Sequence, residues 1–243
     1  MRSVMRVSLA VLTSVALVAP VASAQTVDEI VAKNLQAKGG VEKLKAIQTM
    51  RMTGKVATQG MEMPMTIVSK RPNLMYQEMQ VQDKKIVSAF DGETAWTINP
   101  FMGSDVPQEL QGQQAEMAKE QADLDGVLVD YKTKGHTVEL VGSEEINGTR
   151  VHKLKMTRKS GRVAYLYLDA STGIDVKMTT EMQQGGKTFS LETELSNYQT
   201  VDGITMPFTI RQVMNGMPVA TITVEQVEFG VPVDNSRFKM PAK

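Results

Sequence analysis

The chain has 243 residues, with 27 basic and 27 acidic side chains, a formal net charge of zero, and no cysteine. A balanced charge gives no support for binding to nucleic acid or to an anionic membrane surface. Without cysteine the chain forms no disulfide and carries no lipid-modified cysteine, so any lipid that it handles is bound non-covalently. The length suits one large β domain as readily as two small ones, and it is sufficient for a substantial core.

The first 24 residues match a secretory signal peptide. Arg2 and Arg6 supply the positive start, a short apolar run follows, and Ala24 ends a small-residue cleavage site. The run is too short to span a membrane as a helix, and a retained anchor is the alternative interpretation. We therefore predict export to the periplasm, removal of residues 1–24, and a single domain over residues 25–243.

Two short helices are expected at the start of this domain. Residues 27–35 repeat apolar side chains at helical spacing, with acidic residues near the beginning and Gly39-Gly40 after the end. A second helix is predicted over residues 41–47.

The hydrophobic period changes to two at Met50. Apolar and polar side chains then alternate in five segments, and Gly or Pro marks turns between them, for example at Gln59-Gly60 and Asp91-Gly92. Five strands in about fifty residues indicate an antiparallel meander. The predicted strands cover residues 50–56, 61–67, 73–81, 84–90 and 94–98.

Residues 101–131 interrupt the strand pattern. This segment is polar and rich in Gln, Glu, Ala and Lys, which predicts one or two short helices inserted between strands. An interruption of this length in a sheet protein is typical of a functional segment such as a lid.

Strands resume at residue 137, and Asn147-Gly148 predicts a tight hairpin after the first of them. The patterns together predict a mainly β domain of about eleven antiparallel strands with a few short helices. The later strands cover residues 137–146, 151–157, 163–169, 174–182, 188–199, 208–214 and 219–229.

Residues suited to catalysis or metal binding are not grouped in the sequence. His136 and His152 each stand alone in a predicted strand, and no nucleophile, phosphate-binding or dinucleotide motif is present. Residues 123–126 (DLDG) resemble the start of a calcium loop but lack the remaining ligands, so we interpret them as a turn. We predict no catalytic residue, no metal and no cofactor.

Methionine is the unusual feature of the composition. The chain has 18 methionines but only 5% aromatic residues, and methionines of the first predicted strands recur on alternate positions. Methionine adapts to varied apolar ligands, although ordinary core packing is the alternative for any one of them. A long sheet curls, and few helices would cover it loosely, which leaves an apolar cleft for acyl chains. The candidate ligand-binding residues are Arg71, Met63, Met65, Ile67, Met75, Trp96 and Leu128.

Arg71 is included because its guanidinium group offers five donors in a fixed fork. Near the mouth of a cleft it could bond carbonyl groups of a lid, or the head group of a ligand. By spacing alone, an exposed arginine in a turn is the simpler interpretation.

Several segments resemble the LolA-like outer-membrane lipoprotein-sorting family. They are residues 70–74 (KRPNL), residues 87–96 with Asn99-Pro100-Phe101, and residues 197–207 and 238–241 at the end of the chain. Their shared order extends the resemblance over most of the chain. It implies an open half-barrel of about eleven strands closed by lid helices. Arg71 matches the family's arginine that bonds the lid.

The resemblance also implies a function. The expected protein is a periplasmic carrier that binds acyl chains of lipoproteins in an apolar cavity and moves them toward the outer membrane. An inner-membrane ABC-type complex would load it, and an outer-membrane receptor would unload it. The alternatives are a carrier of other lipids, such as phospholipids or glycolipids, and a module that senses lipid or lipoprotein. We expect a monomer that is not an enzyme and has no nucleic-acid partner.

Overall fold

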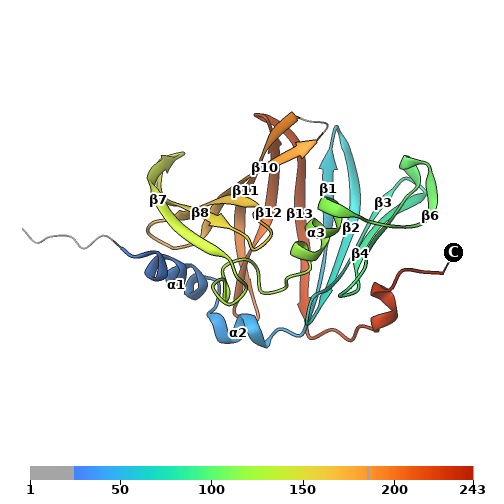
Figure 1. Cartoon of the computed structure of the whole chain (residues 1–243), viewed down its shortest axis with the longest axis horizontal. Helices are drawn as coiled ribbons and strands as arrows, with labels where there is room; N and C mark the ends of the chain where they lie inside the picture. The colour runs from blue at the N-terminus through green and yellow to red at the C-terminus, as the bar shows by residue number, and fades with distance from the viewer. Residues whose placement is uncertain (1–24, 185–186, 243) are drawn as a thin grey trace, which may run out of the picture.

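Most of the chain forms one continuous sheet. The computed structural model describes residues 25–184 and 187–242, so the predicted signal peptide lies outside the described residues. Thirteen strands pair into a single antiparallel sheet (Figure 1). The first six strands are β1 (Thr49–Thr58), β2 (Met61–Lys70), β3 (Leu74–Val81), β4 (Lys84–Phe90), β5 (Ala95–Asn99) and β6 (Ser104–Glu109). The other seven are β7 (Thr137–Ile146), β8 (Thr149–Thr157), β9 (Val163–Asp169), β10 (Asp175–Gln184), β11 (Lys187–Val201), β12 (Ile204–Met214) and β13 (Met217–Phe229).

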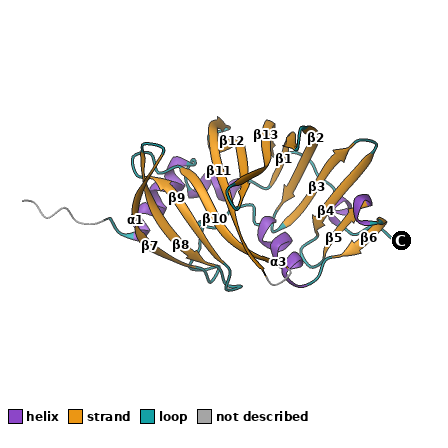
Figure 2. Cartoon of the chain, turned by 90° about the horizontal axis from the view of Figure 1, so that it is seen from above, coloured by secondary structure: helices purple, strands orange, loops and turns teal. Residues whose placement is uncertain are grey.

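The strand order explains the open shape. From edge to edge it runs β6-β5-β4-β3-β2-β1-β13-β12-β11-β10-β9-β8-β7. Each half is a meander, and the first and last strands of the chain pair at the centre, where Met50 lies opposite Phe229. The consecutive strands β6 and β7 therefore lie at opposite edges. Seen from above, the sheet is strongly curved and open (Figure 2).

Tight turns connect most neighbouring strands, as the hairpin after β7 illustrates. Asn147 and Gly148 have φ angles of 50° and 80°. A two-residue hairpin turn of this kind needs positive φ at both positions, which glycine adopts freely and asparagine tolerates. The hairpin predicted from Asn147-Gly148 is confirmed.

The predicted fold class is confirmed, with one correction. The five strands expected between residues 50 and 98 are β1 to β5, but the sheet has thirteen strands and not about eleven. The twelve strand ranges given by the sequence correspond to β1–β5 and β7–β13, so the one strand without a predicted range is β6, inside the segment expected to hold helices only. It is an edge strand with polar residues and Pro107, a residue that edges tolerate because one side of the strand needs no hydrogen bond. Such a strand shows no alternating pattern.

Five helical segments accompany the sheet within residues 25–184 and 187–242. Helix α1 begins with a capping box in which Thr26 and Glu29 bond each other's backbone N–H groups. After its end, Gly39 has a φ angle of 118°, and a Cβ atom there would lie 2.3 Å from the carbonyl oxygen of Gly203. Only glycine allows this close approach to the β11–β12 turn. The helical segments are α1 (Val27–Ala37), α2 (Val41–Ala46), η1 (Pro100–Met102), α3 (Gly112–Gln121) and η2 (Asn235–Phe238).

Residues 110–136, which we call the crossover segment, join the two edges of the sheet. Because β6 and β7 lie at opposite edges, this segment has to pass across the open side. It contains α3, which lies inside the bend of the sheet (Figure 2). The predicted helix between strands is thus confirmed, and its position is that of a cover. Among residues 25–184 and 187–242, no helix has the length and apolarity needed to cross a membrane.

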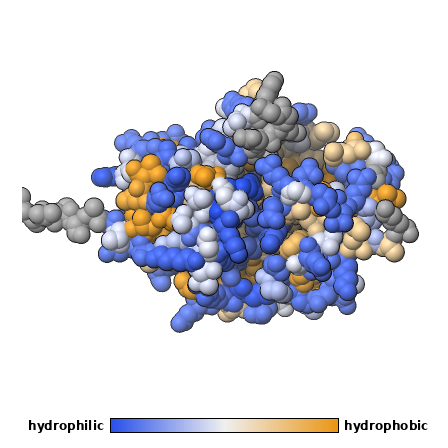
Figure 3. Space-filling view, in the orientation of Figure 1, coloured by the Kyte–Doolittle hydropathy of each residue, from blue (hydrophilic) through white to orange (hydrophobic). Residues whose placement is uncertain are grey.

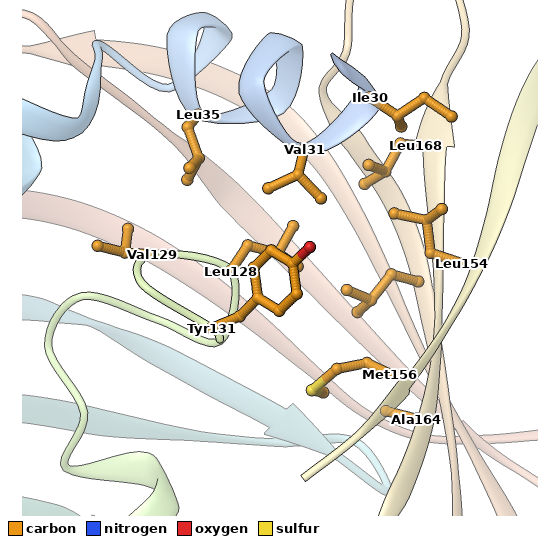
Figure 4. Close-up of a cluster of buried hydrophobic side chains, with 11 residues drawn as sticks. Ile30, Val31, Leu35, Leu128, Val129, Tyr131, Leu154, Met156, Ala164 and Leu168 are labelled. Carbon is orange, nitrogen blue, oxygen red and sulfur yellow. The ribbon is translucent and has the colours of Figure 1, made fainter. Parts of the chain in front are cut away.

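The two halves of the inner face are covered differently. Over β8, β9 and β10, helix α1 packs into a cluster whose buried members are all at most 9% exposed (Figure 4). We call this region the filled half. Over β3, β4 and β5, α3 packs through Ala118 and Ala122 on Met75, Phe90 and Ala95. The buried residues of the filled half are Ile30, Val31, Leu35, Leu128, Val129, Tyr131, Leu154, Met156, Ala164, Leu166 and Leu168.

Candidate functional site

A cleft of about 600 Å³ lies on the inner face at the centre of the sheet, between the filled half and α3. Its walls come from alternate residues of β1, β2 and β3, from β12 and β13, and from one residue of α3. Cross-strand pairs bring the side chains together, since Val56 lies opposite Met63 and Met65 lies opposite Met79. We call it the methionine cleft. It is lined by Met50, Met52, Val56, Thr58, Met63, Met65, Ile67, Ser69, Met75, Gln77, Met79, Gln121, Gln212, Ala220 and Ile222.

None of these lining residues carries a charge. Methionine is the commonest among them, and its unbranched thioether side chain can rearrange around apolar guests of different shapes. The volume falls within the 300–1,000 Å³ or so that is usual for small-molecule sites. The cleft is therefore suited to a flexible hydrocarbon and not to an ionic ligand.

Gly54 helps to keep the cleft open. It lies on β1 opposite Met65, where the alternation of the strand would otherwise place a side chain among the methionines. A Cβ atom on Gly54 would lie 2.2 Å from the carbonyl oxygen of Thr223 on β13. The close approach of the two strands therefore requires glycine, and the wall has no side chain at that point.

Four of the seven residues predicted from the sequence line the methionine cleft, namely Met63, Met65, Ile67 and Met75. Met65 and Met75 are only 3% and 4% exposed, so they support the floor of the cleft as well as forming its surface. The strand alternation brought them together as expected. Sequence reasoning did not select Met79 and Ile222, although both lay on the same alternating pattern.

Trp96 does not line the cleft. It packs with Val87 and Ala89 on the outer face of the sheet, and its indole Nε1–H donates to the carbonyl oxygen of Phe238, 2.7 Å away. Phe238 is the last residue of η2 and is completely buried. Because neighbouring residues of a strand point to opposite faces, Ala95 takes the inner position and Trp96 the outer one. We therefore withdraw Trp96 as a ligand contact.

Leu128 also lies away from the methionine cleft. It is 4% exposed and packs in the filled half against α1, beside Tyr131 (Figure 4). Its role is to anchor the crossover segment to the sheet. The prediction placed it correctly on the covering segment, but the tertiary structure assigns it to the core and to the rim of a separate groove.

Arg71 joins two covering parts, α2 and the crossover segment, to the sheet. Its Nε donates to the carbonyl oxygen of Ile47 at 2.7 Å, and its Nη2 donates to that of Leu44 at 3.1 Å, both at the end of α2. Its Nη1 donates to Asp125 Oδ2 at 2.9 Å, and a second contact joins Nη2 to the same carboxylate. Arg71 follows β2, so it fastens α2 and the crossover segment to the sheet.

We call these contacts of Arg71 the Arg71 tie. Within it, Arg71 and Asp125 each stabilise the charged form of the other. The hydrogen bond from Arg71 holds the pKa of Asp125 below its usual value, and the carboxylate in turn raises the pKa of Arg71. Both side chains are largely buried, at 21% and 15% exposed. Sequence reasoning identified Arg71 but not its partner, because the DLDG segment indicated only a turn.

A second tie holds the other side of α3. Glu120 accepts from Arg162 Nη1 at 2.7 Å and from Ser160 Oγ at 3.0 Å, and it pairs with Arg158 Nε at 3.2 Å. These three partners belong to the β8–β9 hairpin. The crossover segment is therefore fastened to both halves of the bent sheet. No sequence signal linked Glu120 with residues about forty positions away.

The two histidines lie outside both the cleft and the ties. His136 Nδ1 accepts from the backbone N–H of Lys159, and His152 Nδ1 lies 3.2 Å from Ser143 Oγ. Burial lowers the pKa of each, and neighbouring cationic side chains lower it further. Both are partly exposed as predicted, and His152 lies in β8, but His136 precedes β7 and is not a strand residue.

A further cavity, of about 760 Å³, is a different feature. It is a groove between α1, α2 and the loop around Tyr131, and it has several charged side chains at its rim. Of the seven residues predicted to bind ligand, only Leu128 lines this groove.

Hydrophobic side chains also gather at the left end of the face in Figure 3, where the edge strand β7 exposes 37% of Leu140 and 53% of Val141.

Comparison with known proteins places this geometry in a fold class. No family model matches the chain, and none of the curated proteins matches it in sequence. A LolA superfamily protein from Nitrosomonas europaea is similar over 89% of this chain and 98% of its own, with a TM-score of 0.60 and 13% identity. A DUF1329 family protein from Desulfovibrio piger covers 88% and 97%, with a TM-score of 0.59 and 13% identity.

A third similar structure is a domain from Vibrio parahaemolyticus that is named for outer-membrane lipoprotein sorting. It covers 86% of this chain and 94% of its own, with a TM-score of 0.57 and 12% identity. The open thirteen-stranded sheet with its few helices thus has a LolA-like fold. The resemblance predicted from the sequence is confirmed at the level of the fold.

Proposed function

We propose that this protein is an exported carrier that binds acyl chains in the methionine cleft and moves lipoproteins through the periplasm toward the outer membrane. The observation that supports it most directly is the uncharged, methionine-lined cleft of about 600 Å³ at the centre of a LolA-like sheet. A carrier of this kind performs no chemistry on its cargo. The predicted signal peptide supports the proposed location.

The energetics favour hydrocarbon over any polar ligand. Each buried methylene contributes about 0.8 kcal/mol, so an acyl chain of about fifteen methylenes supplies about 12 kcal/mol before ordering costs. No specific polar contact is needed for tight binding. Release is then the difficult step, because the same free energy opposes it.

The crossover segment and α2 form the cover that controls release in this proposal. They are fastened by Arg71 on one side and by Glu120 on the other. A cargo would leave when one tie opens and α3 moves away from the sheet. The inner-membrane ABC-type complex and the outer-membrane receptor implied by the resemblance are the proposed partners that drive loading and unloading.

The test is to identify what the protein carries. The exported protein is purified without detergent from its native host, and native mass spectrometry with lipid extraction measures the bound mass. We expect lipoprotein with its acyl chains in the cleft. Recovery of other lipids alone would favour a general lipid carrier, and a repeatedly empty protein would contradict the proposal.

A variant pair makes the test specific to the cleft. Met63→Gln places an amide in the lining at nearly constant size and is expected to reduce bound lipid strongly. Met61→Gln on the same strand is the control, since Met61 is 49% exposed and lies outside the lining. Equal loss of lipid from both variants would show that the cleft is not the binding site.

A further inference from the structure

Another cavity, of about 410 Å³, lies beneath α3 on the side of β4, β5 and β6. We call it the polar chamber. It differs from the methionine cleft in having amides and hydroxyls as well as apolar groups in its walls. Its lining residues are Met75, Ser88, Thr97, Asn99, Met102, Gln108, Glu109, Leu110, Gln114, Met117, Ala118 and Gln121.

The polar chamber and the methionine cleft are neighbours. Met75 of β3 and Gln121 of α3 line both of them. Met75 is 4% exposed and packs against Ala118, so it forms part of the floor between the two spaces. A molecule that places a hydrocarbon chain in the cleft can therefore reach the chamber with its other end.

The chamber offers hydrogen bonds but almost no charge. Thr97 Oγ1 donates to the carbonyl oxygen of Val87 at 2.7 Å and lies 3.4 Å from Ser88 Oγ, which leaves acceptor capacity on both hydroxyls. The amide groups of Gln108, Gln114 and Gln121 add donors as well as acceptors. Among the described residues that line either space, Glu109 is the one charged side chain.

Helix α3 separates this uncharged environment from a charged one. Gln114, Met117, Ala118 and Gln121 follow helical spacing and face the chamber. Residues of its other side, Glu116, Lys119 and Glu120, line a charged cavity together with cationic residues of the crossover segment and the β8–β9 hairpin. Cationic side chains are thus close by in the fold, but they lie on the wrong side of α3 to meet a group in the chamber.

We propose that the polar chamber holds the uncharged, hydrogen-bonding head of an amphiphile whose acyl chain occupies the methionine cleft. The ligand chemistry that fits is a diacylglyceryl group with ester carbonyls or hydroxyls. A phosphate head group would find no cation in the lining, and it would face the Glu109 carboxylate. The chamber therefore selects against anionic phospholipids.

This inference rests on the proposed function, because it assumes that acyl chains occupy the cleft. A diacylglyceryl group has two sources: a free neutral lipid, and the lipid-modified cysteine at the start of a lipoprotein. Purified protein is incubated with equal amounts of diacylglycerol, a synthetic diacylglyceryl-cysteine lipopeptide and phosphatidylglycerol. The three carry the same acyl chains, and native mass spectrometry measures each bound fraction.

We expect at least about tenfold preference for one or both neutral-head ligands over phosphatidylglycerol, the scale of one hydrogen bond to a charged group lost. The better of the two neutral ligands identifies the source. Equal or preferential binding of phosphatidylglycerol would overturn the inference while leaving the acyl-chain carrier intact. Binding of none of the three would instead contradict both the inference and the proposed function.

Gln114→Lys tests the chamber directly, because it adds a cation to the lining. Phosphatidylglycerol binding is expected to rise about tenfold relative to diacylglycerol. Gln113→Lys is the matched control, with the same change on the same helix at an exposed residue outside the lining. An equal shift in both variants, or none in Gln114→Lys, would place the head group outside the chamber.

Discussion

The filled half and the methionine cleft are two regions of the same inner face of the sheet. They differ in how completely a helix covers them. In the filled half, α1 inserts Ile30, Val31 and Leu35 against β8 to β10, and every buried member of the cluster is at most 9% exposed. Around the cleft, α3 packs on β3, β4 and β5, and methionines of β1, β2 and β3 line a space that no helix fills. Branched side chains have a fixed shape that a helix can match, whereas methionines adapt. One face of a single sheet can therefore form a packed hydrophobic core in one region and a ligand cleft in another.

Stability should separate the two regions most clearly. Leu154→Ala removes a completely buried side chain from the filled half and is expected to lower the free energy of unfolding by about 2–5 kcal/mol. Met79→Ala enlarges a cavity that already exists and should cost less than about 1.5 kcal/mol. Urea unfolding of both variants measures the difference. Similar costs would mean that the cleft is as tightly packed as the core.

The Arg71 tie should matter for release more than for folding. Arg71→Leu removes the bonds to Leu44, Ile47 and Asp125, and leaves a partly buried carboxylate unpaired. We expect a loss of about 1–3 kcal/mol in stability and roughly tenfold faster dissociation of a fluorescent fatty acid, measured by stopped flow. Arg51→Leu is the control, since Arg51 pairs with Glu228 on the outer face. Unchanged dissociation in Arg71→Leu would remove its proposed role.

Acid should weaken the same tie. The pKa of Asp125 is lowered in the folded protein, so its pairing stabilises the fold above the unfolded-state pKa of about 4 and is lost as the pH falls through the folded value. The stability difference between the wild type and Asp125→Asn should therefore be constant from pH 7 to about pH 5 and shrink below about pH 4. A difference that persists unchanged at acidic pH would mean that the carboxylate charge contributes nothing.

The smallest expected effect concerns Trp96, the single tryptophan of the chain. Because Trp96 lies on the outer face under η2, fatty acids with brominated chains should leave its fluorescence almost unquenched. A variant that combines Trp96→Phe with Met79→Trp moves the probe into the cleft lining and should be quenched strongly. Strong quenching of the wild type would contradict the position of Trp96 and restore it as a ligand contact.

Much of the fold could be read from local patterns. Period-two alternation predicted β1 to β5 and placed Met63, Met65 and Ile67 on one face, and Asn147-Gly148 fixed a hairpin. β6 was not predicted because Pro107 is its one buried side chain among residues 105–109, so its sequence shows no apolar alternation. Trp96 was misplaced because alternation separates the two faces of a strand without saying which face is the inner one.

The sequence by itself determined most of the elements and the methionine-rich face, because each depends on neighbours a few residues apart, whereas the candidate tie at Arg71 came from the family resemblance. Only the tertiary structure decided that β1 pairs with β13, that the crossover segment spans both edges, and that Asp125 and Glu120 hold it there. These contacts join residues far apart in the chain, whose partners no local period specifies. Whether an apolar face becomes core or cleft depends on which helix reaches it.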